Sequence, residues 1–315
     1  MKPLEVILLG RIASLGRDAL EAQLKAGRVL ATVPDPGAAA RFPGVFEAVD
    51  VIVGGPLTEA IVTRAARLRL VHVPGAGLDG MGLDLLPSTV PVANTFHHER
   101  SIAEYVFTAM LHLSQRPDLS DRRLREGAWA GFVNYEPPVI ESLAGSTVLI
   151  LGFGHIGKEV AKRAEAFDMQ VIPVTRSTPG WRDRLREARY VVVSCPLNEQ
   201  TRGLLGSAEF SMMRRDAVLI NVARGPVVDE RALYEALRDR VIASAAIDVW
   251  YRYPGAADEI CLPSNYPFHE LGNVLMTPHV SGWTKLTIEG RMRDVADNVA
   301  RLAQGLPLRN VVIQG

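Results

Sequence analysis

The sequence predicts an α/β fold with two doubly wound parallel-sheet domains, and three observations lead to this fold class. Short apolar runs alternate with segments of helical spacing along the chain, which is typical of parallel strands covered by helices. Near the middle, a glycine-rich turn at residues 152–157 follows one such run and precedes an amphipathic segment. The length of 315 residues indicates about two domains.

The first unit, of about 95 residues, begins with an apolar run that ends at Gly10. Residues 12–24 have the apolar spacing of a helix. Thr58 is placed to cap a second helix that extends to Arg67. Apolar runs between turn residues predict the strands of this unit, at residues 4–9, 29–33, 51–53 and 70–73.

The second unit follows a long, mostly apolar segment at residues 101–113 that predicts a helix. An irregular, Arg-rich segment with Trp129 and Pro137-Pro138 comes next. It is too apolar for a free linker, so we expect an arm that packs on another subunit. A helix at residues 294–302 closes the chain. The strands of the second unit are expected at residues 148–151, 170–174, 190–194, 217–221, 243–247 and 274–277.

The glycine-rich turn fits G-x-G-x-x-G, and the strand before it and the helix expected at residues 158–167 make it a dinucleotide-binding hypothesis. The first glycine allows the tight turn, the second lets the backbone approach a pyrophosphate, and the third lets helix and strand pack closely. Free N–H groups at the helix N-terminus face the phosphates. A glycine-rich turn without a ligand is the competing interpretation. The expected cofactor contacts are Gly152, Phe153, Gly154, His155, Ile156 and Gly157.

Composition gives no support for several classes of partner. The chain has 35 basic and 35 acidic residues, so charge gives no argument for nucleic acid or an anionic membrane. Cys195 and Cys261 have no metal-ligand spacing, and Cys195 follows an apolar run, as a buried strand-end thiol would. No run has transmembrane length, and the first apolar run is too short for a signal sequence. We expect a cytoplasmic protein without a metal centre.

Several motifs in a fixed order resemble the D-isomer-specific 2-hydroxyacid dehydrogenase family, in particular its glyoxylate/hydroxypyruvate reductase-like members. The resemblance covers most of the chain, and the ordered set is far more specific than any one motif. The motifs are PGAGLD at residues 74–79, VANT at 92–95, SIAE at 101–104, GFGHIG at 152–157, CPL at 195–197 with TRGL at 201–204, INVARG at 220–225, IDV at 247–249 and TPH at 277–279.

The resemblance implies two Rossmann-like domains, of which the substrate domain is discontinuous. Residues 1–95 and 284–315 would form a flavodoxin-like substrate-binding domain, and residues 96–283 the dinucleotide-binding domain. The family is usually dimeric, which implies a homodimer with the helix near Ser101 and the following arm in the contact. It also implies hydride transfer between a nicotinamide cofactor and a small 2-ketoacid or D-2-hydroxyacid.

The family motifs assign catalytic roles to Arg224 and His279, each of which follows a predicted strand. A guanidinium can hold a carboxylate through two hydrogen bonds and polarise the adjacent keto oxygen. An imidazole that titrates near neutrality suits the general acid/base. A surface arginine and a core histidine are the competing interpretations. By resemblance, the backbone N–H groups of Gly75, Ala76 and Gly77 bind the substrate carboxylate.

The sharpest departure from the family is Tyr253, which stands where the family has a catalytic Glu. A carboxylate beside His279 would raise the pKa of the imidazole, and a neutral phenol does so far less, so we expect reduction to fall off at lower pH than in Glu-bearing relatives. Three interpretations stay open. In the first, another acid (Asp258, Glu259 or Glu270) or Tyr253 itself orients His279. In the second, Tyr251 and Tyr253 shape a pocket for a different substrate. In the third, the chain is a catalytically weak nucleotide sensor. A dehydrogenase of another substrate class, such as an inorganic oxyanion, is a separate rival function.

The predicted second strand of the second unit ends in Thr175-Arg176-Ser177, without the acid that NAD-preferring relatives place there. Arg176 can pair with a 2′-phosphate, helped by the two hydroxyls and by Arg182, so we expect NADP(H) to be preferred and NAD(H) to be possible. An exposed loop arginine is the competing interpretation. The family motifs add further cofactor contacts, which are Cys195, Pro196, Thr201, Val222, Ala223, Asp248 at the nicotinamide end, and His279.

Overall fold

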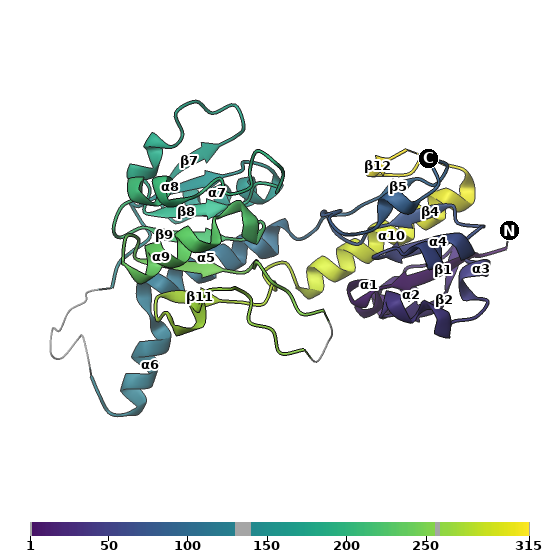
Figure 1. Cartoon of the computed structure of the whole chain (residues 1–315), viewed down its shortest axis with the longest axis horizontal. Helices are drawn as coiled ribbons and strands as arrows, with labels where there is room; N and C mark the ends of the chain where they lie inside the picture. Colours follow the sequence, from purple (N-terminus) through teal and green to yellow (C-terminus); the bar gives the residue numbers. More distant parts are fainter. Residues whose placement is uncertain (1, 130–139, 256–258, 315) are drawn as a thin grey trace. The chain divides into compact units, whose positions relative to one another are not determined.

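The computed structural model describes residues 2–129, 140–255 and 259–314. The chain divides into two compact units. Unit 1 consists of Met1–His97 and Thr284–Gly315, and unit 2 of His98–Trp283. Figure 1 shows the elements of both units along the chain. Each unit holds one six-stranded sheet, and the predicted fold class of two parallel-sheet α/β domains is confirmed.

The sheet of unit 1 has the strand order β12-β5-β4-β3-β1-β2. The strands β1 to β5 pair in parallel, in the 2-1-3-4-5 order of flavodoxin-like folds. The last strand, β12, pairs antiparallel with β5 at the edge, which the sequence did not predict. The strands are β1 (Leu4–Leu9), β2 (Gly27–Val33), β3 (Val51–Gly54), β4 (Leu70–His72), β5 (Val92–Ala93) and β12 (Val311–Ile313).

The longest helix of unit 1 is α10, which buries Met292, Val295 and Val299 among the apolar residues of the sheet. The predicted helix over residues 12–24 is wrong, because the chain forms two short helices that meet at Gly16. A Cβ at Gly16 would lie 2.6 Å from the Met292 Cε, so α10 packs directly on this break. The helices are α1 (Arg11–Leu15), α2 (Arg17–Glu21), α3 (Val45–Ala48), α4 (Glu59–Arg64) and α10 (Lys285–Gln304), with 3₁₀ turns η1 (Pro36–Arg41) and η2 (Leu83–Leu85).

Thr58 caps α4 as predicted, since its hydroxyl accepts a hydrogen bond from the Ile61 N–H at 3.4 Å. The helix nevertheless ends at Arg64 rather than Arg67, because Ala65 leaves the helical conformation.

The sheet of unit 2 is parallel throughout, with the order β11-β10-β9-β8-β6-β7. The strand predictions for this unit are confirmed to within one residue at each end. The strands are β6 (Thr147–Leu151), β7 (Gln170–Val174), β8 (Tyr190–Val193), β9 (Val218–Asn221), β10 (Ser244–Ile247) and β11 (Val274–Met276).

Helices cover both faces of this sheet. Val106 of α5 and Val160 of α7 pack with Ile150 on one face, while Phe210 of α8 and Leu233 of α9 belong to the apolar core of the other face. The helices are α5 (Glu99–Gln115), α6 (Pro117–Arg125), α7 (His155–Ala166), α8 (Ser207–Met212) and α9 (Glu230–Arg238), with 3₁₀ turns η3 (Asp183–Arg186), η4 (Gly225–Val227) and η5 (Phe268–Glu270).

The strand order places a topological switch point beside β6. From β6 the chain goes to β7 on one side and then returns to β8 on the other. At such a point, ligands of open α/β sheets bind outside the carboxyl ends of the strands. The glycine-rich turn follows β6 and therefore lies at this position.

Helix α6 extends away from the sheet of unit 2 (Figure 1). All of its residues are described, and none of them is buried. Leu124 and Trp129 are both more than half exposed. Residues 130–139 of the predicted arm, including Pro137-Pro138, lie outside the described residues. None of the described helices is both long and apolar enough to cross a membrane.

Candidate active site

The glycine-rich turn joins β6 to α7, and each glycine has its own steric surroundings. A Cβ at Gly152, whose φ is +102°, would lie 2.4 Å from the Cys195 N atom, and one at Gly157 would lie 2.4 Å from the Gly152 carbonyl oxygen. A Cβ at Gly154 would meet nothing within 4 Å. The first and third glycines therefore serve close packing, and the second leaves open space beside the backbone. That division matches what a bound pyrophosphate requires.

The start of α7 is the end of a helix that faces the glycine-rich turn. Gly154 is its N-cap and makes no side-chain hydrogen bond, and a helix N-terminus favours a bound anion through its backbone N–H groups. Ser194, at the end of β8, donates a hydrogen bond of 2.7 Å to the Gly152 carbonyl. This bond ties the two loops at the switch point together.

The segment after β7 is polar and exposed. The Thr175 hydroxyl lies 3.2 Å from the Ser177 hydroxyl and 3.1 Å from that of Thr178, and Arg176 is exposed beside them. Arg182 is already engaged, because its Nε donates a 2.7 Å hydrogen bond to Glu209 and its guanidinium lies over the Trp181 ring. Arg176 is therefore the more accessible of the two cations predicted to bind a 2′-phosphate.

The loop after β8 is held by its own polar side chains. The Thr201 hydroxyl donates to the Pro196 carbonyl at 2.7 Å and accepts from the Asn198 N–H at 2.8 Å. Cys195 is buried, and burial raises the pKa of its thiol to about 11. The thiol therefore stays neutral, and Cys195 contributes its backbone, which lies against Gly152, to the shape of the site.

Arg224 follows β9 in a turn that its neighbours fix. The Asn221 side chain donates to the Arg224 carbonyl at 3.1 Å and accepts from the Ala223 N–H at 3.1 Å. The Arg224 Nη1 donates to the Ala223 carbonyl at 2.8 Å, while Val222 and Ala223 are buried. A Cβ at Gly225 would lie 2.4 Å from the Trp250 carbonyl oxygen. The turn with Arg224 thus packs on the segment that leads to Tyr253.

His279 follows β11, and Tyr253 is its hydrogen-bond partner. The Tyr253 hydroxyl lies 3.1 Å from the His279 Nδ1 and accepts a 3.1 Å hydrogen bond from the Trp250 N–H. The Tyr253 side chain is half exposed, and its hydroxyl contacts both of these groups. The residue at the family Glu position therefore does contact the candidate general acid.

Burial dominates the electrostatics of the pair. It lowers the pKa of His279 below its ordinary value; the Asp248 carboxylate opposes this shift, and the Arg224 guanidinium adds to it. Burial also raises the pKa of Tyr253, so its phenol stays protonated near neutral pH. Because a phenol and not a carboxylate lies at Nδ1, the group in contact with the ring does not offset the lowering of the His279 pKa by burial.

Three acids were the other candidates for orienting His279, and the two that are described have contacts elsewhere. Glu259 accepts a 2.6 Å hydrogen bond from the Gly255 N–H, and Glu270 lies 3.8 Å from the His269 Nε2. Asp258 lies outside the described residues. Tyr251 donates to the Val228 carbonyl at 3.0 Å. Tyr253 is thus the candidate for which a direct contact with His279 is found.

Asp248 is completely buried and uses both carboxylate oxygens on the turn that carries His279. It accepts hydrogen bonds from the Thr277 hydroxyl at 2.6 Å and from the N–H groups of Val280 and Ser281 at 2.9 and 3.0 Å. The Tyr105 hydroxyl of α5 lies 2.7 Å from that of Thr277. The sequence singled out Asp248 for the nicotinamide end and missed Tyr105, since no spacing connects α5 to this turn.

The predicted carboxylate-binding turn lies in unit 1, directly after β4. Gly75 and Ala76 are partly buried and Gly77 is exposed. The Gly75 carbonyl accepts a 3.3 Å hydrogen bond from the Thr95 N–H, and the Ala76 carbonyl accepts a 3.2 Å bond from the Asn94 amide. Because these bonds engage the carbonyls, they fix the turn without using its N–H groups.

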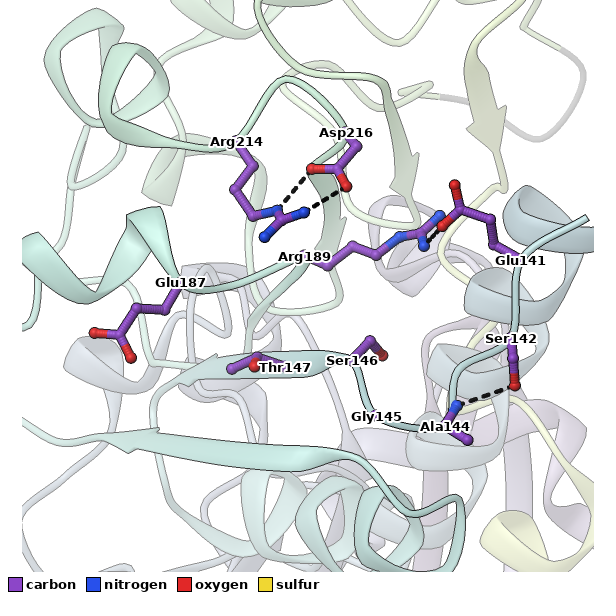
Figure 2. Close-up of a pocket in the computed structure, with 10 residues that line it drawn as sticks. All are labelled: Glu141, Ser142, Ala144, Gly145, Ser146, Thr147, Glu187, Arg189, Arg214 and Asp216. Atoms are coloured by element: carbon purple, nitrogen blue, oxygen red, sulfur yellow. Dashed lines mark hydrogen bonds and ion pairs between the residues drawn. The ribbon is translucent and has the colours of Figure 1, made fainter. Parts of the chain in front are cut away.

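A hollow of about 420 Å³ lies at the other edge of the sheet of unit 2, and its lining residues are drawn in Figure 2. The hollow lies at the amino ends of β6, β8 and β9. It is lined by Glu141, Ser142, residues 144–147, Glu187, Arg189, Arg214 and Asp216. Arg214 is engaged by Asp216 through two hydrogen bonds of 2.7 and 2.8 Å. The hollow is therefore separate from the edge with the glycine-rich turn. Within the described ranges, no group of three His, Cys, Asp or Glu side chains is arranged to hold a metal ion.

Comparisons with known proteins identify relatives of the chain. D-3-phosphoglycerate dehydrogenase of Archaeoglobus fulgidus is 29% identical over 287 residues, which are 85% of this chain and 51% of that protein; the chain thus spans about half the length of this relative. Glyoxylate reductase of Aeropyrum pernix is 31% identical over 269 residues, 80% of this chain and 78% of that protein.

Among solved structures, the NADPH-dependent glyoxylate/hydroxypyruvate reductase of Sinorhizobium meliloti, in complex with NADP and sulfate, has a TM-score of 0.77 at 25% identity and covers 98% of each chain. The family model for the NAD binding domain of D-isomer specific 2-hydroxyacid dehydrogenases matches residues 107–281. The chain belongs to the D-isomer specific 2-hydroxyacid dehydrogenase family.

Proposed function

We propose that the chain is an NADP(H)-preferring reductase of small 2-ketoacids, such as glyoxylate or hydroxypyruvate, that forms D-2-hydroxyacids. One observation carries the proposal. The glycine-rich turn, Arg224 and His279 follow β6, β9 and β11, whose carboxyl ends form one edge of a parallel sheet. The relatives named as glyoxylate reductases support the substrate class.

The proposed mechanism gives each residue one task. Arg224 binds the substrate carboxylate and polarises the adjacent keto oxygen. His279, as imidazolium, gives its Nε2 proton to that oxygen, and in the oxidation direction the neutral ring takes the proton back. The bound nicotinamide supplies or accepts the hydride. We also propose the backbone N–H groups of Gly75, Ala76 and Gly77 as a carboxylate-binding element of unit 1.

Tyr253 orients His279 in this proposal. Its hydroxyl lies 3.1 Å from Nδ1, which leaves Nε2 for the substrate. A catalytically weak nucleotide sensor, the alternative that the missing Glu raised, is not favoured, because His279 keeps a hydrogen-bond partner and the relatives are named as enzymes.

The pH profile of reduction should show the effect of having Tyr253 where the family has a Glu. Reduction needs the imidazolium, and burial lowers the pKa of His279. The kcat/KM for reduction, which reports the free enzyme, should therefore be highest at acid pH and fall as pH rises through an apparent pKa below about 6.5. Tyr253→Glu places a carboxylate at Nδ1 and should raise this apparent pKa by about 1–3 units.

Tyr253→Phe is the matched control, since it keeps the ring and adds no charge. We expect it to lower kcat while the apparent pKa moves much less than in Tyr253→Glu. A wild-type profile with an apparent pKa well above 7, or a Tyr253→Phe enzyme with unchanged kinetics, contradicts the proposed role.

The residues around the glycine-rich turn fit a dinucleotide, and those after β7 fit a 2′-phosphate. Gly154 leaves space beside the backbone, and the start of α7 is free of a side-chain cap. Thr175, Arg176 and Ser177 offer one cation and two hydroxyls. The further contacts that we propose are Gly152, Phe153, His155, Ile156, Gly157, Cys195, Pro196, Thr201, Val222, Ala223 and Asp248.

Arg176→Ala should lower kcat/KM with NADPH by about 10- to 100-fold, as expected for the loss of a hydrogen-bonded charge pair. The value with NADH should change little, because NADH has no 2′-phosphate. Arg184→Ala removes another exposed arginine of the same unit, which pairs with Glu187, and should leave the NADPH/NADH ratio unchanged. A wild-type enzyme that prefers NADH overturns the cofactor proposal.

We further propose a cytoplasmic homodimer in which α5, α6 and the following arm form the contact. The exposed Leu124 and Trp129 support an apolar partner for this segment. Cys195 and Cys261 are free thiols, which suits a reducing compartment.

The direct test of the function is a panel of 2-ketoacids assayed with NADPH and NADH. Turnover of glyoxylate, hydroxypyruvate or a larger 2-ketoacid with NADPH is the expected result. Failure on every 2-ketoacid, with turnover of another substrate class or with nucleotide binding alone, contradicts it.

A further inference from the structure

A line of hydroxyl groups leads from helix α5 to the turn that carries His279. The Tyr105 hydroxyl lies 2.7 Å from the Thr277 hydroxyl, which lies 2.6 Å from the Asp248 Oδ1. Tyr105 and Thr277 are partly buried and Asp248 is completely buried. All three belong to unit 2.

The donors in this line can be assigned. Thr277 donates to the Asp248 Oδ1, and a hydroxyl has a single hydrogen to donate. The Thr277 oxygen is then the acceptor in its contact with Tyr105, and Tyr105 is the donor. The hydrogen bonds therefore all point one way, from Tyr105 through Thr277 to Asp248, and each polarises the next.

The backbone on both sides of His279 is fixed by hydrogen bonds. The two Asp248 oxygens accept from the Val280 and Ser281 N–H groups, which come directly after His279. The Trp250 Nε1 donates to the Thr277 carbonyl at 2.8 Å on the other side. His279 itself has a φ of +58°, which is uncommon for a residue with a side chain. Such a conformation persists when the surrounding contacts determine it.

We propose that Tyr105 is a positioning residue for His279, whose hydroxyl acts through Thr277 and Asp248 to hold the turn that aims the imidazole. This inference rests on the proposed function of His279 as the general acid. Tyr105 itself touches no reacting atom. Its hydroxyl orients Thr277, Thr277 orients the carboxylate, and the carboxylate fixes the two peptide groups after His279.

The Tyr105 hydroxyl remains a donor over the whole range of an activity assay. Burial raises its pKa to about 12, with the Asp248 charge adding to the rise and the hydrogen bond to Thr277 opposing it. The effect of removing this hydroxyl should therefore be the same at every pH between about 5 and 10. Tyr105→Phe should also leave the apparent pKa of the reduction profile unchanged, because burial, Asp248 and Arg224 set the pKa of His279.

Tyr105→Phe removes the hydroxyl and keeps the ring in its packing. We expect kcat for 2-ketoacid reduction to fall about tenfold, as a misaimed proton donor would cause, with both KM values within about twofold. Tyr190→Phe is the matched control, because it removes a buried phenol at the amino end of β8, the edge of the sheet opposite His279. It should leave kcat unchanged. An unchanged kcat in Tyr105→Phe, or equal losses in both variants, overturns the proposal.

Thr277 tests the same line from its middle. Thr277→Ser keeps the hydroxyl and should retain most of kcat, whereas Thr277→Val should lower it by at least as much as Tyr105→Phe. The double variant Tyr105→Phe/Thr277→Val should be no slower than Thr277→Val alone, because both changes break one line. Additive losses would mean that the two hydroxyls act separately, which contradicts the proposal.

A spectroscopic measurement separates this inference from the proposed function. In protein labelled with ¹⁵N at its 7 histidines, the His279 ring signals can be assigned by their absence in His279→Gln. Tyr105→Phe should shift or broaden these signals, and Tyr190→Phe should not. If the wild type reduces no 2-ketoacid, the proposed function fails while this readout still tests the positioning; identical His279 signals in the wild type and Tyr105→Phe overturn it.

Discussion

Replacement of His279 by glutamine is expected to lower kcat/KM for 2-ketoacid reduction by about 10²–10⁴. Glutamine keeps a polar group in reach of Tyr253 but cannot donate a proton to the developing alkoxide. The loss should fall on kcat, because the proton moves in the transition state and not on binding. Steady-state kinetics with NADPH measures it, and NADPH affinity, followed by fluorescence, should stay within a few-fold of the wild type.

His269→Gln is the matched control. His269 is an exposed histidine of the same unit, 3.8 Å from Glu270, and its replacement should leave kcat/KM unchanged. A loss of less than about tenfold in His279→Gln would exclude His279 as the general acid and return the search to other groups at this edge of the sheet.

Replacement of Arg224 by glutamine should cost about 10²–10³ in kcat, the usual result of removing a fixed donor from a developing oxyanion. The KM for the 2-ketoacid should rise as well, since the same guanidinium binds the carboxylate in the ground state. Arg224→Lys keeps the positive charge but loses the planar guanidinium with its paired N–H donors. Its kcat/KM should therefore lie between the values of the wild type and Arg224→Gln.

Two measurements keep this prediction specific. Arg231→Gln removes an exposed arginine of α9 that pairs with Glu235 at 2.8 Å, and it should behave as the wild type. Arg224→Gln should also raise the pKa of His279, because the Arg224 charge lowers it, so the descending limb of the pH profile should move to higher pH. Unchanged KM and kcat in Arg224→Gln would exclude substrate binding by this residue.

Local pattern was sufficient for the elements whose signal lies within a few residues. The strand before Gly152 and the helix after it could be predicted because their apolar residues repeat with the period of each element. Thr58 as a cap is equally local, since its hydroxyl bonds to an N–H three residues later. The strands β8 and β9 of unit 2 are buried along their whole length and stand out as continuous apolar runs in the sequence.

Features that depend on distant segments could not be predicted in this way. Residues 12–24 keep a helical spacing, but Met292 of α10 packs where a Cβ of Gly16 would stand, and the helix breaks there. The antiparallel pairing of β12 with β5 likewise joins segments separated by most of the chain. Neither contact leaves a periodic signal.

The candidate active site, at the sheet edge with the glycine-rich turn, combines both kinds of information. By itself, the sequence determined the glycine-rich turn, the positions of Arg224 and His279 after strands, and the replacement of the family Glu by Tyr253. Only the tertiary structure decided that Tyr253 contacts His279 and that Asp248 holds the turn of His279 through a line from Tyr105. The physical reason is that strand ends and turns follow from local periodicity, whereas a hydrogen bond across 172 residues exists only after the sheet and its covering helix have packed.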